Sequence, residues 1–379
     1  SDYILIEKPI TKQIPQFFSK KICQKCVNDI SVLGISFNSD GICNFCEEYK
    51  NIKPVISDYN SLKKLWLGRI EKYKGKREYD ALVGLSGGKD STYVLYQLKN
   101  IYKLNVKAWT IDQGFLTKWS RERIESIVAE LGVDHEYTVL KQENLAPLYQ
   151  LSIMATGGPC YTCSYAMYSS FIKKASDQGI PMAVHGRSRP QMFKTYSSTY
   201  DLDVYKPFLD MSLRPIENVD LQRTYQEVLA VLNRLMPPDQ IQQFNRYFPN
   251  HKDEGVAEFV PYFLYHPYNE TKLVEFLEVN MNWKRHKDYA IFTHFDCAAH
   301  DAAGYLYEIA DGRPFIMPEL SVSIREGIIS REEAIKRMAK EHFSEVPTES
   351  MNILCNYVRK TQRSLIHNAQ RIAQRKEYL

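Results

Sequence analysis

Tyr79–Ser91 has the sequence YDALVGLSGGKDS, and this stretch decides the fold of the chain. Tyr79–Leu85 is a short apolar run, and a glycine-rich turn follows it directly. Beyond the turn, apolar residues recur at the spacing of one helix face, at Val94, Leu95, Leu98 and Ile101. The stretch therefore predicts a strand, a tight loop and a helix in immediate succession.

The turn reads Ser86-Gly87-Gly88-Lys89-Asp90-Ser91, which is typical of a loop that binds an anion. Its two glycines let the backbone turn tightly and approach a ligand closely. The N–H groups that open the following helix would point at the anion, together with the Lys89 ammonium and the hydroxyls of Ser86 and Ser91. The pattern differs from the Walker sequence, in which a longer glycine loop ends in Gly-Lys-Ser/Thr. We therefore expect a phosphate site of another kind.

Strand and helix patterns alternate after the loop. Val106–Ile111 and His135–Leu140 are predicted strands, with the helix Arg121–Leu131 between them. A helix over Cys163–Asp177 then leads to a fourth strand, Pro181–His185. Such alternation is typical of an α/β protein with a doubly wound parallel sheet, whose ligand lies beyond the carboxyl ends of the strands.

The chain is predicted to divide into four parts. Residues 1–50 hold two cysteine pairs, residues 51–78 resemble an amphipathic connecting helix, and residues 79–210 carry the α/β pattern. Strand signals fade in residues 211–379, where a Ser-x-x-Glu capping box at Ser330 begins a helix. We expect this last part to be a mainly helical domain for substrate binding or oligomerisation.

The composition is that of a globular protein inside the cell. With 379 residues, 44% hydrophobic and 25% charged, the chain is long enough for more than one domain. The net charge of +4 fits a phosphorylated small molecule, and the absence of a dense basic stripe disfavours nucleic acid as a ligand. No apolar run reaches the roughly 18 residues that span a bilayer, and the first residues do not resemble a secretory signal. A cytoplasmic location without a membrane partner is therefore expected.

Four cysteines near the N-terminus predict a zinc site. Cys23/Cys26 and Cys43/Cys46 are two Cys-x-x-Cys pairs at a separation usual for four-cysteine zinc binding. Disulfides are rare in the cytosol, whereas four thiolates in tetrahedral geometry satisfy Zn²⁺. Four protein ligands leave no open position, so the zinc is expected to be structural.

A third pair, Cys160 and Cys163, leaves three interpretations open. The two cysteines stand at the start of a predicted helix near the carboxyl edge of the sheet. They are either buried structural residues, or ligands of a second metal site with Cys297, or a redox or sulfur-carrying pair.

Polar residues in the C-terminal part are candidates for substrate chemistry. His294 and Asp296 lie within Thr293–Cys297, where His294 would act as a general acid–base near neutral pH. Arg325 would hold a carboxylate or phosphate. A structural role for the His and the Asp is equally open.

The motif Ser-Gly-Gly-x-Asp-Ser resembles the pyrophosphatase-loop signature of the adenine nucleotide α-hydrolase-like superfamily. The resemblance implies that ATP is bound, that its α–β bond is broken, and that a carbonyl or carboxylate oxygen is adenylated. It implies that the loop grips pyrophosphate and that Asp90 organises Mg²⁺-bound phosphates, with Lys89 beside them. Asp112, after the second strand, and Gly186 with Arg187, after the fourth, would contact the nucleotide or the substrate. A structural role for Asp112 is equally open.

The order of motifs over residues 20–340 also resembles the N-acetyl sugar amidotransferase family of surface-polysaccharide and nonulosonic-acid pathways. The shared features are the paired cysteines, the loop, the central Cys-x-x-Cys, Thr-His-x-Asp-Cys and Ser-x-x-Ile-Arg-x-Gly. Members convert a sugar N-acetyl group into an acetamidino group. The resemblance implies that the amide oxygen attacks the α-phosphate of ATP, that pyrophosphate leaves, and that ammonia then displaces AMP. Since the chain has no obvious glutaminase nucleophile, a glutaminase partner is expected to supply the ammonia.

Two rival functions remain open from the sequence. The first is ATP-dependent sulfur insertion into tRNA or a small molecule, as in relatives that hold an iron–sulfur cluster by three cysteines with one iron open. The second, a zinc-ribbon module that binds nucleic acid, is disfavoured by the nearly balanced charge. The sequence leaves open the identity of the sugar and whether the chain forms a homodimer.

Overall fold

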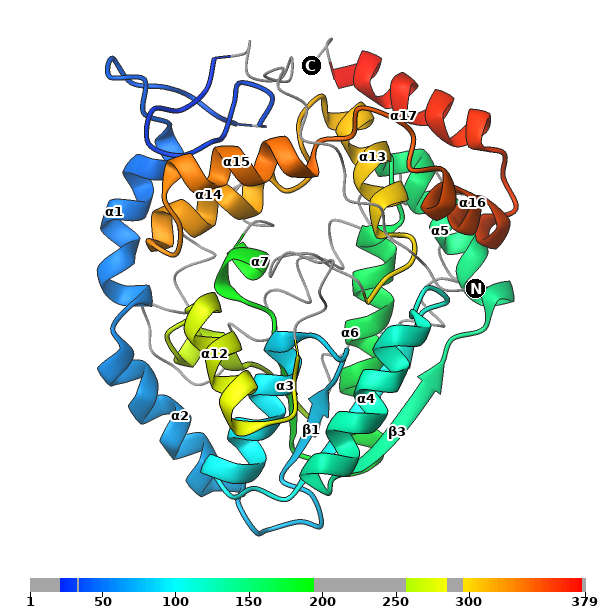
Figure 1. Ribbon diagram of the computed structural model, residues 1–379. Helices are drawn as coiled ribbons and strands as arrows, with labels where there is room; N and C mark the ends of the chain where they lie inside the picture. Colours follow the sequence, from blue (N-terminus) through cyan, green and yellow to red (C-terminus); the bar gives the residue numbers. More distant parts are fainter. Residues whose placement is uncertain (1–20, 33, 194–256, 285–295, 377–379) are drawn as a thin grey trace.

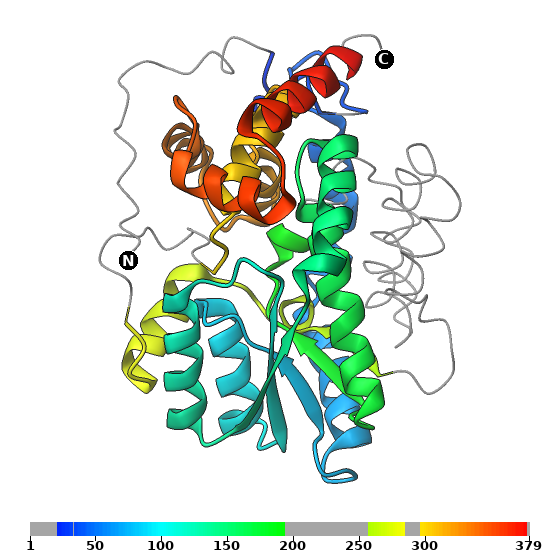
Figure 2. The same ribbon diagram turned by 90° about the vertical axis from the view of Figure 1, so that its right-hand side faces the viewer.

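The computed structural model describes residues 21–32, 34–193, 257–284 and 296–376. These residues form a parallel α/β unit that continues into a helical part (Figures 1 and 2). In the described ranges, no helix has both the length and the apolar character needed to cross a membrane. His294, with the neighbouring Thr293, lies outside the described residues.

The sheet is parallel throughout, with the strand order β3-β2-β1-β4-β5. Its strands are β1 (Ala81–Gly84), β2 (Val106–Asp112), β3 (Asp134–Val139), β4 (Met182–His185) and β5 (Glu258–Pro261). The central position of β1 places the loop that follows it in the middle of the carboxyl edge. This position is where an open parallel sheet binds its ligand.

Helices cover both faces of the sheet because the strand residues alternate between two cores. Val83 of β1 packs in the core that includes α2 (Tyr59–Tyr73), α3 (Lys89–Tyr96) and α4 (Lys118–Leu131). Leu82 packs in the opposite core, which includes α5 (Gln142–Thr156) and α6 (Cys160–Asp177). The predicted doubly wound sheet is confirmed.

The fifth strand was missing from the sequence prediction, which placed four strands before residue 210. Glu258–Pro261 is only four residues long, and it pairs with β4 at the edge of the sheet. Such a short run carries little periodic signal. Its terminal proline is tolerated because an edge strand has an unpaired side. The sheet therefore extends beyond the expected domain boundary.

The N-terminal half of the connecting segment also differs from the prediction. Instead of one helix within residues 51–78, α1 runs over Asn44–Ile56 and α2 begins at Tyr59. Asp58 is the N-cap of α2, and its side chain accepts a hydrogen bond from the backbone N–H of Ser61. Because α1 starts directly after Cys43, the second cysteine pair is joined rigidly to a helix.

Apart from β5, the C-terminal part is helical in its described residues, as the prediction of a mainly helical region requires. After the short helices α7 (Arg189–Phe193) and α11 (Tyr262–Tyr265) come α12 (Glu270–Asn280), α13 (His300–Asp311), α14 (Met317–Glu326), α15 (Arg331–Glu341), α16 (Thr348–Val358) and α17 (Gln362–Lys376). Ser330 caps α15 by accepting the backbone N–H of Glu333, at the position that the capping box predicts. Figure 1 shows α14 and α15 beside the N-terminal segment, whereas α16 and α17 lie against α5.

Candidate functional site

The loop after β1 has the backbone geometry of an anion site. Gly87 has a φ of 79°, and a Cβ there would stand 3.0 Å from the carbonyl oxygen of Ser120. Gly88 is the N-cap of α3, and no side chain caps the helix start. The first N–H groups of α3 are thus left to a ligand, and a helix N-terminus favours negative charge. This is the setting expected for phosphate binding.

Hydroxyl groups stabilise the loop from inside. The hydroxyl of Ser91 donates to the carbonyl of Gly88 at 3.2 Å and accepts the N–H of Ser86 at 3.2 Å. The Thr92 hydroxyl donates to the same carbonyl at 2.7 Å. Ser91 therefore shapes the loop, and the sequence expectation that Ser86 and Ser91 also touch the ligand stays a prediction.

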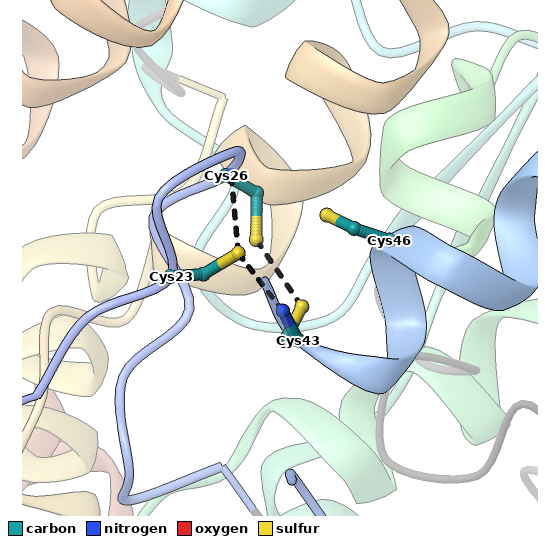
Figure 3. Close-up of side chains that lie close together, drawn as sticks. All are labelled: Cys23, Cys26, Cys43 and Cys46. Carbon is teal, nitrogen blue, oxygen red and sulfur yellow. Dashed lines mark hydrogen bonds between the residues drawn. The ribbon is translucent and has the colours of Figure 1, made fainter. Parts of the chain in front are cut away.

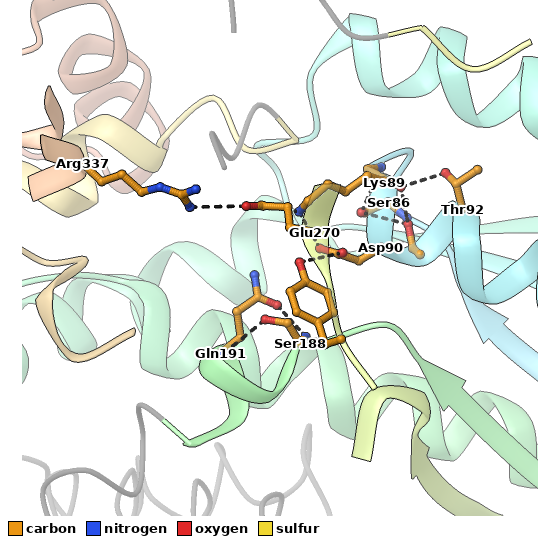
Figure 4. A network of polar contacts seen from close by, with 11 residues as sticks. Ser86, Lys89, Asp90, Thr92, Ser188, Gln191, Glu270 and Arg337 are labelled. Carbon is orange, nitrogen blue, oxygen red and sulfur yellow. Dashed lines mark hydrogen bonds and ion pairs between the residues drawn. The ribbon is translucent and has the colours of Figure 1, made fainter. Parts of the chain in front are cut away.

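Charged groups from two elements meet at the mouth of the loop (Figure 4). The Lys89 ammonium lies 2.8 Å from the Asp90 carboxylate and 3.4 Å from that of Glu270, the first residue of α12. The hydroxyl of Tyr268 donates to the other Asp90 oxygen at 3.1 Å. Burial opposes the charge of Lys89, but the nearby carboxylates raise its pKa well above the usual range. The ammonium therefore keeps its charge at neutral pH, where it is paired with two carboxylates.

The loop after β4 packs closely against the start of α3. A Cβ on Gly186 would come within 2.9 Å of the carbonyl carbon of Asp90 and 3.0 Å of the Ser91 nitrogen. Glycine is thus required for the loop after β4 to reach the start of α3. Arg187 donates to the carbonyl of Gln191 at 2.8 Å, and its guanidinium lies over the Tyr168 ring. The expected contacts of Gly186 and Arg187 with the nucleotide or substrate stay predictions.

Gly186→Ala is expected to lower AMP formation from ATP by about a hundredfold, because small displacements in a site can cost that much. The added methyl would push the β4 loop away from the backbone of Asp90. Gly68→Ala is the matched control, since the α2 position has open space around it and helical backbone. Equal rates of AMP release by the two variants would contradict the close packing.

Asp112 at the end of β2 is engaged within the protein. Its carboxylate accepts the N–H of Gly114 at 2.8 Å and forms an ion pair with Arg121. The segment after β2 contacts the helical part. The ring centroids of Phe115 and of Tyr357 on α16 lie 4.6 Å apart. A contact between Asp112 and adenosine stays a prediction.

The four N-terminal cysteines form one cluster. Their Sγ atoms all lie within 4.8 Å of one another, and all four side chains are fully buried (Figure 3). The Cys23 sulfur accepts backbone N–H groups from Cys26 at 3.4 Å and Cys43 at 3.3 Å. Thiolates that accept N–H groups are the donor set of a closed tetrahedral zinc site, so the residues fit Zn²⁺.

Arg325 lies beside this cluster. The arginine is on α14 with 4% of its surface exposed. The hydrogen bond to Cys23 raises the pKa of Cys26, but hydrogen bonds to Cys43 and Cys46 lower it, and with the positive charge of Arg325 the pKa falls to about 7. A substrate role for Arg325 stays a prediction.

A second group of cysteines lies near the carboxyl edge of the sheet: Cys160 and Cys163, together with Cys297, which is far from them in the sequence. Cys297 pairs in an antiparallel bridge with Leu116, just beyond β2. Burial raises the pKa of Cys163 to about 12, and the charge of Cys160 adds to this. Burial also raises the pKa of Cys297 well above its usual value, with contributions from Cys163, Asp296 and Cys160.

The second group is not among the compact sets of metal-ligating side chains found in the described residues. Among the described residues, only the N-terminal cysteines have ligand atoms that all lie within 4.8 Å of one another. A metal-binding role for Cys160, Cys163 and Cys297 stays a prediction.

Glu270, Tyr268 and Arg337 were missed by the sequence analysis. Arg337 on α15 lies 3.3 Å from Glu270, which in turn contacts Lys89 (Figure 4). About 180 residues separate Glu270 from the loop, and no motif marks it. No local pattern identifies such a contact.

The described residues form a parallel α/β protein with a glycine loop after its central strand, a four-cysteine segment before the sheet and a helical part after it. No protein-family model matches the chain. Among curated proteins, uncharacterized protein MJ1599 of Methanocaldococcus jannaschii is 23% identical over 187 residues, which cover 49% of this chain and 58% of the relative. The chain thus spans little more than half the length of that relative.

Three solved structures show a likeness in fold. U34-tRNA thiolase NcsA from Methanococcus maripaludis, with its 4Fe–4S cluster, has a TM-score of 0.36 and 16% identity, over 87% of this chain and 91% of that one. NMN synthetase from Francisella tularensis has a TM-score of 0.29 and 15% identity, over 50% and 92%. NH3-dependent NAD synthetase from Campylobacter jejuni has a TM-score of 0.28 and 15% identity, over 50% and 93%.

Proposed function

We propose that the protein cleaves ATP to AMP and pyrophosphate in order to adenylate a carbonyl oxygen of a second substrate. The observation that carries this proposal is the uncapped start of α3 after a glycine turn, with the Lys89 ammonium at its mouth. These groups suit the charge that develops on departing pyrophosphate. Mg²⁺, when bound, would be held by the Asp90 carboxylate and phosphate oxygens, and would neutralise part of that charge.

The first candidate for the second step is amidation of an N-acetyl sugar, which rests on the order of motifs in the sequence. The amide oxygen attacks the α-phosphate and pyrophosphate departs. Ammonia then adds to the activated carbon, AMP leaves with the oxygen, and loss of a proton gives the amidine. A glutaminase partner would supply the ammonia. His294 and Asp296 are the proposed proton-transfer groups.

The second candidate is sulfur insertion, and the convergence of Cys160, Cys163 and Cys297 specifically favours it. The first step is unchanged, and a sulfide in place of ammonia displaces AMP from the activated carbon. The three thiolates would hold an iron–sulfur cluster, which would present the sulfide.

One assay separates these candidates. The protein is incubated with ATP, Mg²⁺ and N-acetylated sugars or unmodified tRNA, with either ammonium or sulfide as the nucleophile. AMP release with the mass change of oxygen to NH on a sugar supports amidation, and the change of oxygen to sulfur supports the second candidate. Release of ADP and phosphate in place of AMP would overturn the proposal as a whole.

If sulfur is inserted, Cys297→Ser is expected to remove iron from protein purified without oxygen and to abolish its visible absorbance. Losing one of three thiolates opens a second coordination position and weakens the cluster. Cys355→Ser, which changes a lone cysteine on α16, is the matched control. Iron-free wild-type protein that holds only zinc would instead favour amidation.

A further inference from the structure

Glu270 is the residue through which the helical part reaches the phosphate loop. One of its oxygens lies 3.4 Å from the Lys89 ammonium, and the other lies 3.3 Å from the Arg337 guanidinium. The side chains of the three residues are between 12% and 16% exposed. Figure 4 shows Glu270 between Arg337 on one side and the Lys89–Asp90 pair on the other. At such low exposure, charge interactions are screened less than on the surface.

Local structure holds Glu270 in this place. The side chain of Asn269 accepts the N–H of Lys272 at 3.0 Å and so caps α12, which makes Glu270 its first residue. Tyr268, just before the cap, donates its hydroxyl to Asp90 at 3.1 Å. One short segment therefore contacts both charged residues of the loop.

Arg337 is held from the other side by α15. Its Nε lies 2.8 Å from Glu333, one turn earlier on the same helix. At the start of that helix, Arg331 donates to the backbone carbonyls of Cys26 at 3.1 Å and Cys23 at 3.2 Å. A single helix thus joins the four-cysteine cluster to the residue that neutralises Glu270.

We propose that Glu270 and Arg337 are positioning residues that hold the Lys89 ammonium ready for the triphosphate of ATP. This inference rests on the proposed function and names two further residues that act on the same site through Lys89. Without nucleotide, Lys89 is shared between the carboxylates of Asp90 and Glu270. When ATP binds, its phosphate oxygens compete for the ammonium, and Arg337 lowers the repulsion between Glu270 and the phosphates.

Two substitutions with opposite charge effects test the proposal. Glu270→Gln removes a negative charge near the phosphates but loosens Lys89. We expect equal or tighter ATP binding with a turnover rate about tenfold lower, because the ammonium is misplaced in the transition state. Arg337→Met leaves Glu270 unneutralised, so we expect ATP binding about tenfold weaker. The double variant should bind ATP close to wild type, because the two charges are coupled.

Lys336→Met is the matched control. It makes the same charge change on α15, but Lys336 is exposed and paired with Glu332 at 3.0 Å. ATP dissociation constants, single-turnover rates of AMP formation and melting temperatures are measured for all variants. Arg337→Lys keeps the positive charge, so it should bind ATP about as tightly as wild type. If Arg337 had only a structural role, Arg337→Lys and Arg337→Met would bind ATP equally well.

The outcomes separate this inference from the proposed function. If Glu270→Gln weakens ATP binding, or if Arg337→Met behaves like Lys336→Met, the positioning role is overturned while wild-type AMP formation stands. If wild-type protein neither binds ATP nor forms AMP, the proposed function fails and the positioning role fails with it.

Discussion

Asp90→Asn is expected to reduce AMP formation by about a hundredfold or more, the scale on which electrostatic stabilisation of a transition state is lost. The substitution keeps the shape of the side chain and removes the charge that would bind Mg²⁺-phosphate. The loop should still fold, because its hydrogen bonds come from Ser91 and Thr92. Quantifying AMP and pyrophosphate at saturating ATP measures the effect.

Protonation of the Asp90 carboxylate should lower the rate of AMP formation at low pH. Burial raises the pKa of Asp90, against the lowering influence of the Lys89 charge. With a raised pKa, Asp90 takes up its proton at a higher pH than an ordinary aspartate does. As the pH is lowered, the wild-type rate of AMP formation should therefore decline at a higher pH than the one at which exposed aspartates titrate. The residual rate of Asp90→Asn should not show this decline.

Asp177→Asn is the control for Asp90→Asn. Asp177 ends α6, is about half exposed and pairs with Lys173 at 2.6 Å. Its loss should leave both the rate and the pH profile unchanged. Undiminished AMP formation by Asp90→Asn would remove the basis for assigning a phosphate role to the loop.

Cys46→Ser is expected to cause the largest loss of stability. Apparent free energies of zinc binding in small structural sites are about 10–16 kcal/mol, and part of this stabilises the fold. We expect the free energy of unfolding to fall by at least about 3 kcal/mol, because loss of a metal site is among the most damaging single changes. Zinc content and thermal or urea unfolding measure the effect.

The loss should spread beyond the cluster, because buried side chains of α14 and α15 pack against it. Met317, Leu320, Ala334 and Met338 share a core with the four cysteines. Cys355→Ser serves as the control, since Cys355 is half-buried and lies outside this core. Full zinc content in Cys46→Ser, or equal melting temperatures for the two variants, would contradict a four-thiolate site.

The sequence predicts local features of this protein well. The strand, the glycine turn and the start of α3 follow one another within a dozen residues, so steric and periodic rules suffice to predict them. The capping box at Ser330 and the two cysteine pairs are local patterns of the same kind, and the structure confirms both the cap and the four-cysteine cluster.

The sequence predicts distant contacts poorly. β5 was missed because four residues carry little periodicity, and its place beside β4 depends on the whole sheet. Glu270 and Arg337 were missed because a lone acid and a lone base on helices most often face solvent.

Sequence alone therefore determined the parallel α/β architecture, the glycine turn before α3 and the two cysteine pairs that form the N-terminal cluster, since each rests on patterns local to one part of the chain. Only the tertiary structure decided which side chains surround Lys89 and that Cys297 lies near Cys160 and Cys163. The physical reason is that these groups are held by packing between elements up to about 180 residues apart in the chain, and no local pattern records that packing.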